Sequence, residues 1–185
     1  MDAITTVPPP VNEANLSYAP GSTERASLES RLKELAEADS IELTAAVGGR
    51  REPASGEPFD VTMPSDHAHV LGHASQATTD DAEAAVEAAL AAAPEWARMA
   101  FDDRAAIFLR AADLLAGPWR DTLNAATMLG QGKTVQQAEI DAACELIDFW
   151  RFNVAFARDM LENQPVSSAG VWNRTDYRPL DGFVY

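Results

Sequence analysis

Glu139 is the residue of this sequence whose position most strongly suggests chemistry. A helix is expected over residues 134–162, and advancing 100° per residue from Glu139 places it, together with Asn153, within the apolar arc. A carboxylate there is costly to bury unless it is paired or hydrated. Two interpretations are open: Glu139 meets an arginine or a backbone amide of the layer below, or it borders a polar cavity that binds a ligand. The arc contains Val135, Ala138, Ala142, Ala143, Leu146, Phe149, Trp150, Phe156 and Met160.

Cys144 is the only cysteine, which excludes an internal disulfide and a cysteine-cluster metal site. The same helical projection puts it on the polar arc, next to Glu145. A nucleophilic cysteine needs a nearby cation or a helix N-terminus to lower its pKa. The middle of a helix beside a carboxylate provides neither, so we expect an inert thiol and no catalytic residue in this chain.

Three histidines could share one face of a strand, since His67, His69 and His73 stand at i, i+2 and i+6. Such a face could hold zinc. Leu71-Gly72 interrupts the pattern and no carboxylates accompany it, so we favour histidines of a loop or an edge strand and expect no metal site. No Ser/His/Asp constellation is evident from the sequence.

Residues 130–134 (GQGKT) resemble the end of a phosphate-binding loop. That motif requires a glycine where Thr127 stands and a strand before it, whereas the pattern here predicts a helix. A helix stop followed by a turn is the simpler interpretation.

Helices and short strands are expected to position these residues. Proline and small polar residues make residues 1 to about 24 an extended arm. Helices are expected at residues 22–37, at 79–93 ending before Pro94, at 102–129 with a break at Gly117-Pro118 and an end at Gly130, and at 134–162. A small edge sheet is expected from strands at 41–47, 59–63 and 70–74, and residues 166–185 read as two or three further strands.

The composition fits one globular domain of 185 residues, with 46% hydrophobic and 23% charged residues. The formal net charge of −15 disfavours nucleic acid and anionic membrane surfaces as partners. No apolar run approaches the ~20 residues of a membrane span. The N-terminus lacks the features of a secretory or mitochondrial leader, so we expect a cytoplasmic protein.

Several segments resemble the aldehyde dehydrogenase superfamily, and within it the L-glutamate γ-semialdehyde (1-pyrroline-5-carboxylate) dehydrogenases of proline catabolism. The most specific are residues 130–134 and 137–153 (QAEIDAACELIDFWRFN). Supporting stretches are residues 12–13, 21–25, 103–115 and 178–184. The similarity runs from about Asn12 to Tyr185.

The resemblance implies an NAD-dependent oxidation of L-glutamate γ-semialdehyde to L-glutamate by a thiolate nucleophile, a glutamate general base and an asparagine that holds the oxyanion. These residues and the glycine-rich cofactor turn are expected beyond Tyr185, so NAD binding and activity are not expected of this chain alone. The glutamate matching Glu139 faces the aldehyde pocket in the subfamily, which favours a substrate-binding role for Glu139. The complete enzyme is expected to be a homo-oligomer.

The implied fold class is α/β, as the N-terminal fragment of the aldehyde dehydrogenase fold. Its expected divisions are an arm (1–25), a short helix with edge strands (26–78), a helical layer of the cofactor-binding domain (79–163) and the start of oligomerisation strands (164–185). Two other hypotheses stay open: a stand-alone interaction module that pairs with a full-length dehydrogenase, and a pseudoenzyme scaffold.

Overall fold

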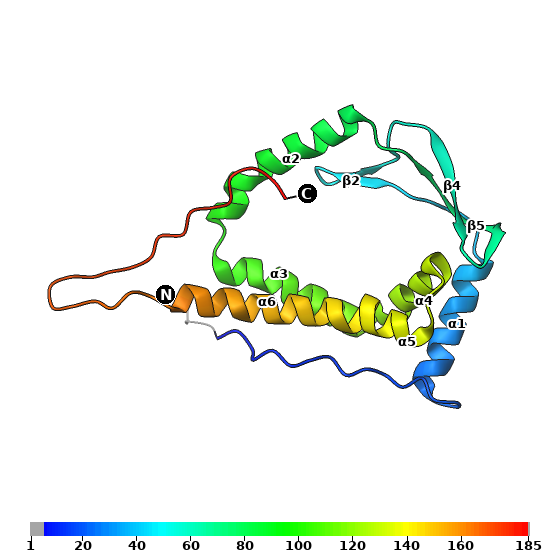
Figure 1. The fold of residues 1–185 in the computed structure, drawn as a ribbon, viewed down its shortest axis with the longest axis horizontal. Helices are drawn as coiled ribbons and strands as arrows, with labels where there is room; N and C mark the ends of the chain where they lie inside the picture. Colours follow the sequence, from blue (N-terminus) through cyan, green and yellow to red (C-terminus); the bar gives the residue numbers. More distant parts are fainter. Residues whose placement is uncertain (1–5, 185) are drawn as a thin grey trace.

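The computed structural model describes residues 6–184, which combine a layer of helices with two small sheets (Figure 1). The mixture of helices and strands expected from the sequence is confirmed. In chain order the elements are α1 (Thr23–Glu37), β1 (Ile41–Glu42), β2 (Ala45–Val47), β3 (Arg50–Glu52), β4 (Pro58–Met63), β5 (Asp66–Ser75), α2 (Thr79–Arg98), α3 (Phe101–Ala116), α4 (Arg120–Gln131), α5 (Val135–Ala138), the π-helix η1 (Glu139–Cys144) and α6 (Glu145–Glu162).

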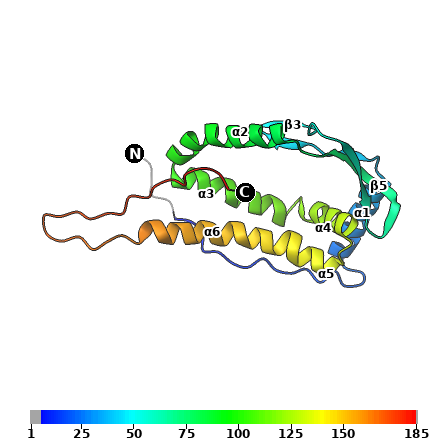
Figure 2. The same cartoon turned by 45° about the horizontal axis from the view of Figure 1, so that its top comes forward.

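Helices α3 and α6 lie side by side, as Figure 2 shows. Their contact holds the main core. Ala112 and Leu115 of α3 pack against Ala143 of η1 and Ile147 of α6. Ile147 is completely buried, which contributes roughly 1.5–3 kcal/mol relative to an exposed side chain. Small alanines on both sides of this contact let the two helices approach closely.

A second, smaller core joins the N-terminal segment to α4. Tyr18, Leu28 of α1 and Ala125 of α4 are buried together. Ser22 caps α1 by accepting a hydrogen bond from the Arg25 amide, which confirms the predicted start of this helix. The N-terminal segment is therefore packed onto the helical layer before α1 begins.

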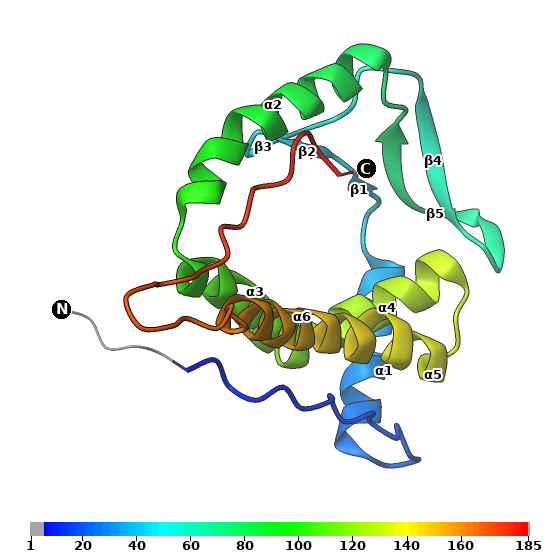
Figure 3. The ribbon, with the colours of Figure 1, turned by 60° about the vertical axis from the view of Figure 1, so that its left-hand side comes forward.

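The strands and α2 arch away from the helical layer (Figure 3). One sheet has the order β1-β5-β4, with β5 parallel to β1 and antiparallel to β4, and β2-β3 form a separate hairpin. All three histidines lie in β5, which continues through Leu71-Gly72. The expectation of a loop or edge strand is wrong for His73, which stands between Asp60 of β4 and Glu42 of β1. His67 and His69 lie in the part of β5 beyond its pairing with β1.

Two predicted helix ends differ from the structure. α2 continues through Pro94 to Arg98, because the surrounding stretch is exposed and water can replace the hydrogen bond that proline cannot donate. α4 continues through Gly130 to Gln131, since the left-handed C-cap with φ 67° is Gly132.

The predicted tail strands are absent from residues 166–184, where only one isolated bridge joins Ser168 to Val171. Strand-forming residues need a neighbouring strand to complete their hydrogen bonds, and none pairs with this segment in the described chain. Among residues 6–184, no helix combines the length and hydrophobicity needed to cross a bilayer.

Candidate functional site

Glu139, at the start of η1, is the centre of a buried polar cluster. Its side chain is 0% exposed. Arg120 of α4 donates through Nε at 3.3 Å and also through Nη2, and Asn124 donates through Nδ2 at 2.8 Å. Arg120 and Asn124 are four residues apart, so they share one face of α4 and can reach the same carboxylate.

Two further donors to Glu139 come from residues 12–18, an extended segment that we call the strap. The backbone amide of Leu16 donates to Oε1 at 2.8 Å, and the hydroxyl of Tyr18 donates to Oε2 at 2.8 Å. The first interpretation of Glu139, pairing with an arginine and a backbone amide, therefore describes its contacts in the structure.

Glu13 anchors the strap at a second point. Its carboxylate accepts hydrogen bonds from Nη1 of Arg120 and from Nη1 of Arg151, both at 2.7 Å. Its amide and the side chain of Asn12 both donate to Asp148 at 2.7 Å. Arg120 thus bridges two carboxylates, Glu13 and Glu139, and ties the strap, α4 and η1 together.

The π-helix brings Cys144 into this cluster. In a π-helix the hydrogen bonds run from i to i+5, so Glu139 and Cys144 come onto the same side. Arg120 Nη2 lies 3.4 Å from the thiol, and the thiol lies 3.7 Å from Glu139. The prediction that Cys144 occupies the polar arc is wrong, because 100° per residue does not hold across η1.

The same wide turn shifts the buried face of α6. Ile147 and Val154 are buried, whereas Phe149, Phe156 and Met160, predicted on the apolar arc, are 60%, 55% and 63% exposed. Each buried residue of α6 stands about one position later in the sequence than the residue that the projection placed on the buried face. The part of the predicted arc before and inside η1, such as Ala138 and Ala143, is buried as expected.

Charge and burial perturb the ionisable groups of the cluster. Burial opposes ionisation of Glu139, but the hydrogen bonds from Arg120 and its neighbours outweigh it and lower the pKa of Glu139 to about 2. Burial, followed by the charge of Glu139, raises the pKa of the Cys144 thiol to about 11. Burial and the hydrogen bond to Glu139 raise the pKa of Tyr18 above its ordinary value.

These groups hold the strap but lack the means for covalent catalysis. Burial and a raised pKa disfavour the thiolate form of Cys144, and its lack of reactivity stays a prediction. The strand-to-helix connection between β5 and α2 is residues 76–78 (QAT) and contains no glycine. A contact between Glu139 and substrate stays a prediction, since both carboxylate oxygens already accept hydrogen bonds.

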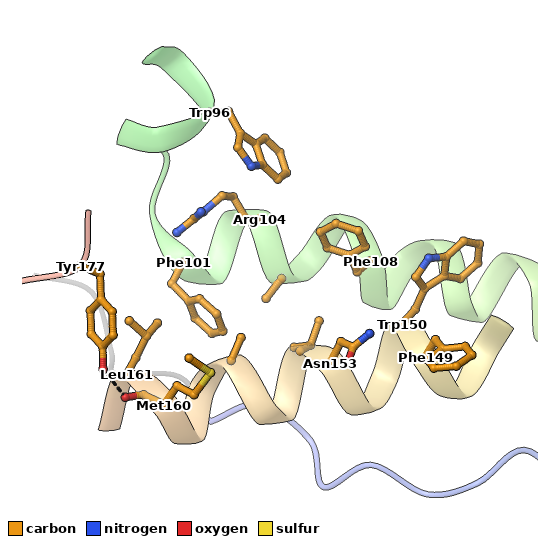
Figure 4. A pocket seen from close by; sticks show the side chains of 13 residues that line it. Trp96, Phe101, Arg104, Phe108, Phe149, Trp150, Asn153, Met160, Leu161 and Tyr177 are labelled. Carbon is orange, nitrogen blue, oxygen red and sulfur yellow. Dashed lines mark hydrogen bonds between the residues drawn. The ribbon is translucent and has the colours of Figure 1, made fainter. Parts of the chain in front are cut away.

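A separate cavity of about 520 Å³ lies between α3 and α6 and was not identified from the sequence (Figure 4). Its walls are mostly aromatic, including Trp96, Phe101 and Phe149. The guanidinium carbon of Arg104 lies over the ring of Trp96, 5.9 Å from its centroid. The Nε of Arg104 is buried without a hydrogen-bond partner among the described residues. The aromatic side chains of α6 were the sequence signal that could have indicated this cavity. The projection at 100° per residue placed them on the apolar arc instead.

Residues 130–134 form a helix stop followed by a turn, as the simpler interpretation predicts. Gly132 caps α4, and Thr134 opens α5 with a capping box in which Gln137 takes part. The glycines therefore serve two helix ends and do not form a phosphate loop.

The histidines are not grouped for metal binding, and the described residues contain no cluster of potential ligands. The structure instead places His73 between Asp60 and Ser40. These contacts are not evident from the sequence, because the residues are 13 and 33 positions apart and strand pairing brings them together.

The chain is similar to known dehydrogenases over nearly its whole length. It is 48% identical over 179 residues to the Delta-1-pyrroline-5-carboxylate dehydrogenase of Agaricus bisporus, covering 96% of this chain and 33% of that protein. The mitochondrial Delta-1-pyrroline-5-carboxylate dehydrogenase of Homo sapiens is 44% identical over 173 residues, covering 94% and 30%. The chain thus spans about a third of the length of these relatives.

Solved structures show the same relation. The Delta-pyrroline-5-carboxylate dehydrogenase of Mycobacterium tuberculosis, in a crystal structure bound with NAD, superposes with a TM-score of 0.94 at 61% identity, covering 99% of this chain and 34% of that one. The fold described above therefore matches the N-terminal part of that fold. Residues 51–185 match the model of the aldehyde dehydrogenase family, and the chain belongs to that family.

Proposed function

We propose that this chain is the N-terminal part of an NAD-dependent dehydrogenase that oxidises L-glutamate γ-semialdehyde to L-glutamate. The observation that carries the proposal is 61% identity over 99% of the chain to a pyrroline-5-carboxylate dehydrogenase crystallised with NAD. The helix string of residues 137–153, specific to this subfamily, supports it from the sequence. A small-molecule substrate and self-association of the complete protein belong to the same proposal, with residues 164–185 as the start of the oligomerisation strands.

Within that enzyme, this chain supplies a scaffold and no reacting group. When bound, NAD would accept the hydride of the aldehyde. Arg120 and the strap hold the carboxylate of Glu139 in one orientation and keep it ionised. If Glu139 meets substrate, it does so as a fixed anion that attracts a cationic group, and one of its present donors must yield.

The test compares the chain with the product of the full reading frame beyond Tyr185. Purified full-length protein should produce NADH from L-glutamate γ-semialdehyde, and the 185-residue chain should produce none. Turnover by the pure chain would overturn the assignment of the reacting groups to the remainder.

In the full-length protein Cys144→Ser should keep kcat, because the thiol is buried.

Glu139→Ala in the complete enzyme tests the substrate-binding role. A substrate contact predicts that kcat/KM falls further than the loss of folded protein explains, whereas a scaffold role predicts a lower melting temperature with unchanged kcat/KM.

We propose the cytoplasm as the compartment, although several relatives are named as mitochondrial, and cell fractionation distinguishes the two.

One observation favours the interaction-module alternative. Phe149, Phe156 and Met160 line up along an exposed face of α6, which suits packing against another polypeptide. Co-elution of the chain with a separately expressed full-length dehydrogenase would support an interaction module. Independent elution would count against the module and favour the proposal that the chain is the N-terminal part of the enzyme.

A further inference from the structure

Ser40, His73 and Asp60 form a connected chain of polar side chains across the three-stranded sheet. Nδ1 of His73 lies 2.8 Å from Oδ1 of Asp60, and Nε2 lies 3.0 Å from Oγ of Ser40. The side chains of His73 and Asp60 are 48% and 58% exposed, so a small molecule in solution can reach them.

Strand register builds this arrangement. His73 stands directly opposite Asp60 on β4, and on its other side β1 runs parallel to β5 and begins immediately after Ser40. Gly72 permits the close approach of β1, because a Cβ at this position would lie 2.7 Å from the carbonyl oxygen of Ile41. The three side chains are therefore held by backbone pairing on both sides of β5.

The order of the contacts is that of a nucleophile, a base and an orienting carboxylate. A carboxylate only accepts, so Asp60 fixes the proton of the neutral imidazole on Nδ1 and leaves the lone pair of Nε2 facing the hydroxyl of Ser40. We propose that Ser40 is an activated nucleophile that accepts acyl groups from small activated esters.

The step balances without any further cofactor. Oγ of Ser40 bonds to the ester carbonyl carbon, its proton passes to Nε2 of His73, and the bond to the leaving alkoxide or phenoxide breaks as that group departs. The imidazolium gives this proton to the leaving oxygen or to solvent and is neutral again. Water then attacks the carbonyl carbon of the acyl-serine while its proton passes to Nε2 of His73, the bond between that carbon and Oγ breaks as the carboxylic acid leaves, and His73 returns the proton to Oγ, which regenerates the hydroxyl. The reaction needs neither NAD nor the proposed dehydrogenase activity, so either proposal can fail alone.

The chain itself is tested with p-nitrophenyl acetate. We expect release of p-nitrophenolate, and an acid-quenched sample should carry an acetyl group on Ser40 by peptide mass spectrometry. Ser40→Ala should lower the rate by ~10-fold. This is less than the 10²–10⁴-fold that general-base catalysis typically contributes, because the site is open to water. Ser30→Ala, which removes an exposed serine of α1, is the matched control and should keep the rate.

His73→Gln and Asp60→Asn complete the test, with circular dichroism to verify folding. Both should slow the reaction and reduce acetylation of Ser40. If Ser40→Ala keeps the parental rate, the proposal is overturned. If His73→Gln abolishes the rate while Ser40→Ala keeps it, the imidazole acts without the serine. Acetylation confined to lysines would overturn the proposal as well.

Discussion

Arg120 and Glu139 depend on each other, because each is buried with a full charge. The side chain of Arg120 is 7% exposed and that of Glu139 0%, so removing one partner leaves the other as an uncompensated charge in a poorly hydrated site. Such a loss is far more costly than the pair is stabilising. Glu13 neutralises the remaining side of Arg120, and the cluster therefore behaves as one unit.

Glu139→Gln should lower the free energy of unfolding of the chain by about 3 kcal/mol, because the amide keeps the size of the side chain but leaves Arg120 buried with less opposing charge. Urea unfolding measures this change. Glu145→Gln, on the exposed side of the same helix, should change stability by less than about 0.5 kcal/mol. Equal effects of the two variants would contradict the role of the cluster.

The lowered pKa of Glu139 predicts a specific response to acid. The carboxyl moves from an ordinary value of 4.5 to about 2 on folding, so its charge stabilises the folded chain fully above about pH 4.5. That contribution is lost as the pH falls from 4.5 towards 2. The stability difference between the parent chain and Glu139→Gln should therefore shrink over this range. A difference that is independent of pH would refute the assigned pKa.

At the scale of elements, η1 decides which residues of the long helix face inward. Its i to i+5 hydrogen bonds widen one turn, so Cys144 joins Glu139 and the buried face of α6 shifts by about one residue. The hydrophobic pattern of α6 is thus consistent with a helix, but its phase cannot be continued from α5.

Deleting Asp141 from η1 should be tolerated better than inserting one alanine after it. Deletion places Glu139 and Cys144 at i and i+4, which share one face of an ordinary α-helix, at the cost of the partly exposed Lys133–Asp141 ion pair. Insertion turns the Glu139 side away from Arg120 and should cost roughly 3 kcal/mol or more. Comparable urea midpoints for the two variants would argue against this account of the π-turn.

The two glycines at the end of α4 should respond oppositely to alanine. Gly130 lies within the helix and an added Cβ meets no atom within 4 Å, so Gly130→Ala should stabilise by roughly 0.5–1 kcal/mol. Gly132 has φ 67°, where alanine is strained, so Gly132→Ala should destabilise by about 1 kcal/mol. Thermal unfolding of both variants checks the position of the helix end, and the reverse order would place it at Gly130.

At the scale of the whole molecule, the strap connects distant parts of the chain. Residues 12–18 contact α4, η1 and α6 through Arg120, Glu139, Asp148 and Arg151. By contrast, residues 176–184 form neither helix nor strand. The two ends of the described chain should therefore differ strongly in local stability.

Hydrogen exchange should detect that difference. The amides of Glu13 and Leu16 donate to buried or partly buried carboxylates and should be protected although they lie outside regular structure, whereas residues 176–184 should exchange rapidly. Glu139→Gln should weaken protection of Leu16 more than that of Glu13, whose acceptor is Asp148. Rapid exchange at both amides in the parent chain would show that the strap is not held.

The sequence alone determined the mixed fold, most helices, the cap at Ser22 and the unusual position of Glu139, because these follow from local propensity and periodicity. It also identified the family through residues 130–134 and 137–153. Only the tertiary structure decided the partners of Glu139 on α4 and the strap, which lie 15 to 123 positions away, and the meeting of Ser40, His73 and Asp60. A one-residue change of helical phase at η1 and the pairing of strands around β5 are collective results of packing, and no local pattern encodes them.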